Sequence, residues 1–156
     1  MTERAFGGAF PHQHGDPRPL VERIEAQLRE RLEEAVEMAG LKLMVETRQR
    51  FGRPAPETSS AADRKEFEQT ADALLTHLRQ AFWGELTPEQ RAGVDAAEAG
   101  ASGRRERLLA AQIVLARQLP DYWQRFETHA GAFSRSRLEG PTAAKSGWLS
   151  RLLKSE

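Results

Sequence analysis

The sequence contains no cysteine among its 156 residues. This absence excludes a disulfide framework, a thiolate nucleophile and sulfur ligation of a metal, and it fits a reducing compartment. Long apolar runs are missing too, since no stretch approaches the roughly 18 consecutive apolar residues of a membrane span. The opening stretch, MTERAFGGAFPHQHGD, lacks the apolar core of a secretory signal peptide. We therefore expect a cytoplasmic protein that touches a membrane at most peripherally.

An excess of charge of one sign is also absent. Lys and Arg together number 23 and Asp and Glu together number 23, so no global field draws the chain toward nucleic acid or anionic lipid. The arginines do gather at three places, namely Arg48, Arg50 and Arg53, then Arg104, Arg105 and Arg107, then Arg135 and Arg137. Each group has acidic neighbours, and we interpret all three as solvated arginines near helix ends. This interpretation disfavours nucleic acid as a partner.

Catalytic and cofactor signatures are scarce. The sequence has no Gly-x-Ser-x-Gly, no Gly-rich phosphate loop and no Glu-x-x-His of a di-iron bundle. His77 and His129 fall on separate predicted helices, and each is a candidate haem ligand only if an apolar cavity surrounds it. His12, His14 and Asp16 offer nitrogen and oxygen ligands for a divalent metal but no rigid support. We therefore expect no cofactor and favour a protein that is not an enzyme.

Helical periodicity, in contrast, is abundant from Pro19 onward. Residues 1–18 hold glycines and prolines without periodicity and are predicted to form a flexible leader. Apolar residues then recur at helical spacing and predict a helix from Pro19 to about Phe51, which Gly52 ends. Gly40 weakens this helix, and a short strand over LKLMV at 41–45 is the alternative.

Two further helices have clear start signals. Ser59 or Ser60 can cap a helix that runs to Trp83. Thr87, Pro88 and Gln90 form the pattern of a capping box at the start of the next one. That third helix carries only Val94 and alanines before two glycines, so it is expected to bury little.

The second half of the chain is predicted to hold the most buried helix and an aromatic one. Residues 104–119 carry apolar side chains over more than half of the helix circumference, which indicates the central element. An aromatic stripe follows from Tyr122 and is expected to end between Ser136 and Gly140. Residues 19–139 should therefore form one all-α domain, an antiparallel bundle of four or five helices. Residues 140–147 are small and polar and are predicted to be a linker.

The last segment, WLSRLLK at 148–154, is a short amphipathic motif, called here the C-terminal motif. At helical spacing its apolar residues share one face and its cations the other. Three readings are open: the motif folds back on its own bundle, docks on another protein, or lies on a membrane surface. The apolar face consists of Trp148, Leu149, Leu152 and Leu153, and the cations are Arg151 and Lys154.

These observations predict a protein-interaction module, such as an adaptor or a chaperone-like or regulatory bundle, that also self-associates. The C-terminal motif is the expected docking element for another protein. Trp83 is a second possible contact, whereas its neighbour Phe82 is expected to plug the core. The alternatives are a haem- or ligand-binding sensor or enzyme, and a nucleic-acid-associated protein. The abundance of Arg, Ala and Glu with few Ile and Tyr is typical of bacterial chains from GC-rich genomes.

Overall fold

The computed structural model describes the backbone of residues 18–57 and 59–154 and the side chains of residues 18–57 and 59–139. Across these ranges all regular secondary structure is helical, which confirms the predicted all-α bundle. Most of the predicted leader lies outside the described residues. The helices are α3 (Leu20–Arg50), α4 (Ala61–Trp83), α5 (Pro88–Ala99), α6 (Arg104–Gln118) and α7 (Tyr122–Lys154).

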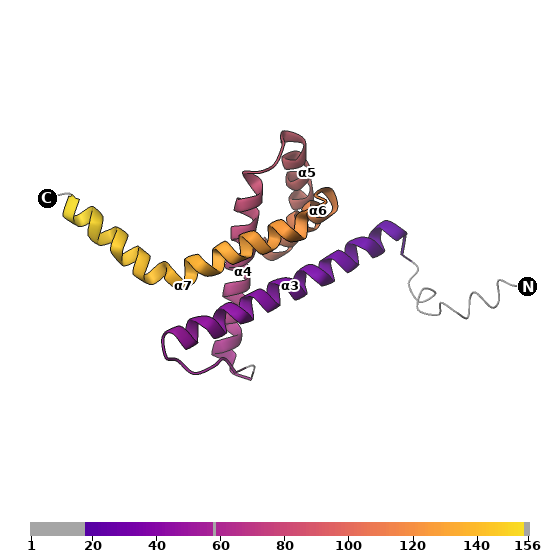
Figure 1. Cartoon of the computed structure of the whole chain (residues 1–156). Coiled ribbons are helices and arrows are strands. Elements are labelled where there is room, and N and C mark those ends of the chain that lie inside the picture. Colours follow the sequence, from indigo (N-terminus) through magenta and orange to yellow (C-terminus); the bar gives the residue numbers. More distant parts are fainter. Residues whose placement is uncertain (1–17, 58, 155–156) are drawn as a thin grey trace, which may run out of the picture.

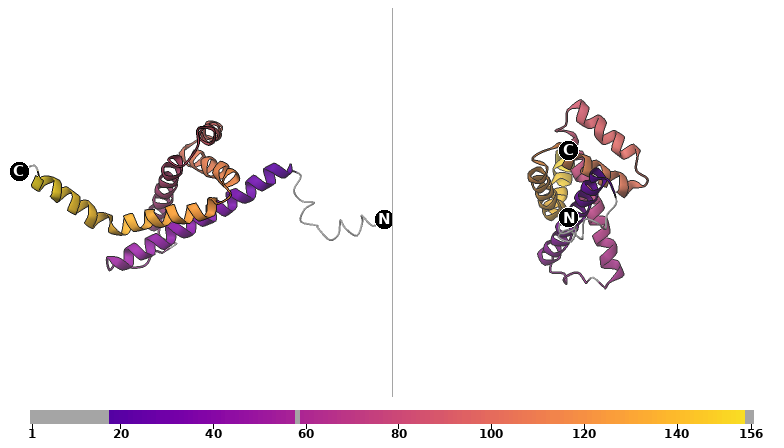
Figure 2. Two further views of the ribbon diagram at one scale, coloured as in Figure 1. Left: turned by 45° about the horizontal axis from the view of Figure 1, so that its top comes forward. Right: turned by 90° about the vertical axis from the view of Figure 1, so that its right-hand side faces the viewer.

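The helices cross rather than stack in a single layer. Helices α3 and α7 lie side by side and run in the same direction, and α4 crosses both of them (Figures 1 and 2). Helix α5 packs on α6 at the end of the bundle that is uppermost in Figure 1. Helix α6 contacts each of the other four helices, which confirms its predicted central position.

Helix α3 is continuous through Gly40, so the strand alternative for residues 41–45 is wrong. Gly40 is buried because α4 crosses there, and a Cβ at this position would lie 3.4 Å from Cε1 of Phe67. The glycine therefore brings the two helices close together at a small cost in helix propensity. The helix stops where predicted, since Gly52 has a φ of 65° that other residues rarely adopt.

The predicted helix starts are confirmed at α4 and α5. The Ser60 hydroxyl accepts a hydrogen bond from the backbone N–H of Asp63 at 3.2 Å. At α5 the Thr87 hydroxyl accepts from the N–H of Gln90 at 3.2 Å, and the Gln90 side chain accepts from the N–H of Thr87 at 2.9 Å. Val94 is the one buried residue of α5, and this short helix packs on α6.

The core receives side chains from all five described helices and contains one buried polar pair. Apolar side chains of α3, α4, α6 and α7 form most of a single cluster, to which α5 adds Val94, and each fully buried leucine contributes about 1.5 to 3 kcal/mol. Within it the Tyr122 hydroxyl donates a 2.7 Å hydrogen bond to Oε1 of Gln112, and the Tyr122 ring stacks on Phe82. Burial raises the pKa of the Tyr122 phenol far above its usual value, so this group stays neutral.

Helix α7 does not end between Ser136 and Gly140 as expected but continues to Lys154. The predicted linker at 140–147 is therefore helical, with Pro141 inside the helix. A proline in a helix removes one backbone hydrogen bond and bends the axis without always ending the helix. Figure 1 shows α7 changing direction where its colour passes from orange to yellow, and the last part projects beyond the bundle.

Candidate functional site

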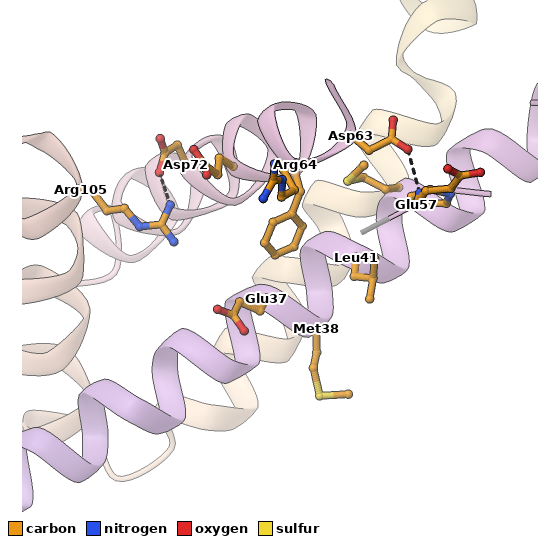
Figure 3. A pocket seen from close by; sticks show the side chains of 12 residues that line it. Glu37, Met38, Leu41, Glu57, Asp63, Arg64, Asp72 and Arg105 are labelled. Atoms are coloured by element: carbon orange, nitrogen blue, oxygen red, sulfur yellow. Dashed lines mark hydrogen bonds and ion pairs between the residues drawn. The ribbon is translucent and has the colours of Figure 1, made fainter. Parts of the chain in front are cut away.

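A groove lies between the second half of α3 and the first half of α4 (Figure 3). It has a volume of about 790 Å³, and α6 reaches its edge through Arg105. The loop between α3 and α4 contributes Glu57 at one end. Volumes of about 300 to 1,000 Å³ are usual for pockets that bind small ligands. The groove is open along one side and can therefore receive an extended or helical segment.

The surface of this groove is largely apolar. Met44 and Phe67 form its covered part, with Met44 only 3% exposed. Met38 and Leu41 belong to the same surface, yet they are 67% and 46% exposed. Large apolar side chains that gather beside a hollow at this exposure are typical of a binding surface, whereas single exposed ones are common everywhere.

Charged side chains surround the apolar surface, and two of the acids already have partners. Asp72 accepts a 2.7 Å hydrogen bond from Arg105, drawn as a dashed line in Figure 3, and Asp63 accepts one of 2.7 Å from Arg48. Among the side chains that the structure describes, the remaining acids of the groove form no ion pair. These acids are Glu37, Glu57 and Glu68. Among the described residues that line the groove, Arg64 is the one cation that forms no ion pair. The groove therefore has an acidic rim.

One end of the groove is held in place by Arg48. Its side chain is buried and bonds Asp63 and Glu66, while Asp63 also accepts from the backbone N–H of Glu57 at 2.8 Å. The hydrogen bond from Arg48 and the one from the Glu57 backbone lower the pKa of Asp63 below its usual value. The prediction that Arg48 is a solvated arginine is therefore wrong: two carboxylates of α4 compensate its burial. The network fixes the α3–α4 loop against α4.

The two histidines on separate helices come together at the interface of α4 and α7. The His77 ring lies 5.3 Å from that of Phe133, and the His129 ring lies 4.9 Å from that of Phe82. Burial, and then the charge of His129, lower the pKa of His77, while a backbone interaction with His129 acts in the opposite direction. Both imidazoles take part in packing between the helices, and neither lines the groove. Because the two histidines are far apart in the sequence, the sequence alone does not predict that they lie close together in the fold.

Trp83 lies half-buried at the end of α4 beneath arginine side chains. The guanidinium carbon of Arg79 is 4.1 Å from the centre of its ring and that of Arg91 is 5.1 Å away. Arg91 also donates a 3.1 Å hydrogen bond to the Trp83 carbonyl. Phe82 is fully buried, which confirms its predicted place in the core. A role for Trp83 in binding a partner stays a prediction.

The other predicted site residues fall outside what the structure describes. His12, His14 and Asp16 lie outside the described residues, and the side chains of Trp148, Leu149, Arg151, Leu152, Leu153 and Lys154 lie outside the described side chains. Within the described part of the chain, no three His, Asp or Glu side chains are close enough to share a metal ion. No helix there has the length and apolarity to cross a membrane.

No protein-family model, curated protein or solved structure significantly matches this chain.

Proposed function

We propose that this protein is a non-enzymatic interaction module that binds partner proteins by laying a helix in a groove. The groove between α3 and α4 is the proposed surface that receives a helix, because the exposed side chains of Met38 and Leu41 lie there beside a covered apolar floor. Amphipathic helices dock in such grooves by their apolar face. The C-terminal motif is the proposed docking helix, since its apolar residues recur at helical spacing.

The expected affinity of one such contact is modest. Burial of the four apolar residues of the motif contributes about 6 to 12 kcal/mol in total. Ordering a free peptide costs about 1 to 2 kcal/mol per residue, and association costs several kcal/mol more. Because α7 continues as a helix to Lys154, part of the ordering cost is already met within the fold. A dissociation constant in the micromolar range or weaker follows, and several copies together would bind more tightly through avidity.

The test compares three forms of the tagged protein: the full chain, a chain that ends at Gly140, and a full chain with Trp148→Ser and Leu152→Ser. The described residues of α7 that reach the core lie at or before Leu138, so both altered forms should melt within a few degrees of the unaltered chain. Both should lose the proteins that co-purify with the full chain. A Ser150→Ala chain is the matched control, because this residue lies off the apolar face at helical spacing.

Three results would contradict the proposal. Equal recovery of partner proteins by all the forms would remove the motif from docking. A large fall in melting temperature on truncation would show that the motif folds back on its own bundle. A Soret band in the purified protein would favour a haem-binding function instead.

A further inference from the structure

We infer that the groove between α3 and α4 receives the C-terminal motif of a second copy of this chain. The inference rests on the proposed function, because it names the occupant of the groove and the partner of the motif. Three observations carry it: charge, the chemistry of the groove surface, and the direction in which α7 leaves the bundle.

The charges of the two surfaces are opposite. The groove retains Glu37, Glu57 and Glu68 without ion pairs among the described side chains, against Arg64 alone. The motif carries Arg151 and Lys154 and no acid. Exposed ion pairs add little affinity each, yet opposite potentials select the partner and set its orientation. A basic amphipathic helix therefore fits this groove better than an acidic or neutral one.

The groove surface suits a Trp- and Leu-rich helix. Met38 and Met44 both contribute to it, beside Leu41 and Phe67. Methionine is unbranched and polarizable, so a methionine-lined surface adapts to the shape of an apolar helix face. The exposed part of this surface is found on Met38 and Leu41, and a docked motif would cover it.

The path of α7 directs the motif to another molecule. Helix α7 meets α3 and α4 beside a smaller hollow, which Arg137 lines together with Leu43 and Thr47, and of the described residues Met44 alone lines both this hollow and the groove. Its last part then projects beyond the bundle, away from the crossing of α3 and α4 (Figures 1 and 2). A continuous helix thus holds the motif away from the groove of its own chain and presents it to the groove of a second copy.

Charge reversal on each surface gives the decisive test. One chain carries Glu37→Arg and Glu68→Arg in the groove, and another carries Arg151→Glu and Lys154→Glu in the motif. We expect the unaltered chain to self-associate with rising concentration in sedimentation velocity. Each altered chain alone should associate at least about fivefold more weakly, since like charges then face each other. An equimolar mixture of the two should associate as the unaltered chain does.

The mixture separates docking between copies from docking within one chain. In the mixture the reversed groove of one chain meets the reversed motif of the other, so recovery requires contact between molecules. A chain with Glu30→Arg and Glu34→Arg is the matched control, because these exposed glutamates of α3 lie outside the groove. It should sediment as the unaltered chain does, and circular dichroism and melting of every variant check that each one folds.

Two outcomes would overturn the inference. One is an unaltered chain that stays monomeric at all concentrations. The other is an altered pair that fails to recover association in the mixture. Neither outcome decides the proposed function, which is judged by loss of other partner proteins from the chain that ends at Gly140.

Discussion

At the scale of residues, one substitution can remove the hydrogen bond from Tyr122 to Gln112, and its effect on the free energy of unfolding can be estimated. In a Tyr122→Phe chain the ring still stacks on Phe82, but Oε1 of Gln112 loses its donor in the core. Nε2 of Gln112 already has no partner within the described part of the chain. We expect the free energy of unfolding to fall by about 1 to 3 kcal/mol, the cost of leaving a buried acceptor unpaired. Urea denaturation measures this change.

A second substitution tests the cause of that loss. Adding Gln112→Leu to Tyr122→Phe removes the unpaired amide together with the hydroxyl. The double variant should recover part of the lost stability, because replacing both members of a buried pair by apolar groups is often close to neutral. If Tyr122→Phe alone left stability unchanged, the hydrogen bond would have no net value in the fold.

His77 makes stability depend on pH. Its pKa is lowered in the folded state, so below the unfolded value of about 6.5 the unfolded chain binds a proton that the folded chain does not. The free energy of unfolding should therefore decrease as the pH falls below about 6.5, by at most about 1.4 kcal/mol per pH unit for this one group. Above that pH the contribution of His77 to the pH dependence should vanish. Denaturant unfolding at a series of pH values measures the slope.

A chain with His77→Phe is the comparison for that slope. Phenylalanine keeps an aromatic ring against Phe133 but does not titrate. His129, whose Nε2 lies 3.2 Å from Oε2 of Glu85, and the other histidines are still present, so the difference between the two chains reports His77 together with its interaction with His129. Identical slopes for both chains between about pH 7 and pH 5 would contradict the assignment.

At the scale of elements, α5 buries the fewest residues of the five described helices and packs on α6. Val94 is its one buried residue, so we expect its capping box to contribute measurably to its stability. In a Thr87→Ala chain the N–H of Gln90 loses its acceptor, at a cost of about 1 kcal/mol. We expect faster hydrogen exchange of the α5 amides than in the unaltered chain, with the amides of α4 and α6 much less affected.

Thr128 supplies the matched control for this change. It is exposed within α7, and its hydroxyl bonds the carbonyl of Gln124 in the preceding turn. Thr128→Ala should leave exchange in α5 unchanged and stability nearly so, because alanine is the better helix former. Equal protection of α5 in the Thr87→Ala and unaltered chains would show that packing on α6, and not the cap, holds the helix.

The sequence predicts an element well where its signal is local. The caps at Ser60 and Thr87 and the stop at Gly52 each depend on a few neighbouring residues, and all three are confirmed. The predicted end of α7 is wrong because Gly140 and Pro141 have the pattern of a helix terminus, whereas a helix can pass through a proline by bending. The conformation of the apolar run at 41–45 is ambiguous in the sequence, because a short apolar run fits a strand or a helix. Its packing against α4 accompanies the helical conformation that the structure shows.

At the scale of the whole molecule, the groove could not be predicted from the sequence. Its lining comes from α3, α4, their connecting loop and α6, and it exists because α4 crosses α3 at an angle near Gly40. Crossing angles depend on which side-chain ridges interdigitate, and periodicity does not report them. The burial of Arg48 was missed likewise, because its acidic partners lie on the next helix.

The shape of the molecule gives a measurable dimension. Helix α3 has 31 residues and so spans about 46 Å, and the last part of α7 projects further. A compact domain with as many residues as this chain has a radius of gyration of about 15 Å. Small-angle X-ray scattering of the dilute protein should give a value several ångströms larger, and a chain that ends at Gly140 should give a smaller one. A full-length value near about 15 Å would contradict the projecting helix.

If the groove receives the C-terminal motif of a second copy, as we infer, the separation of these two surfaces on one chain governs how large the assembly becomes. A contact between unlike surfaces leaves one groove and one motif unused at the two ends of every complex that does not close on itself. The rotation imposed by each contact then decides the outcome: a closing rotation yields a ring of fixed size, and any other yields a fibre that lengthens with concentration. The change of direction of α7 seen in Figure 1 would then set this rotation. Substitution of Pro141, which lies inside the helix, should change assembly size without altering either surface.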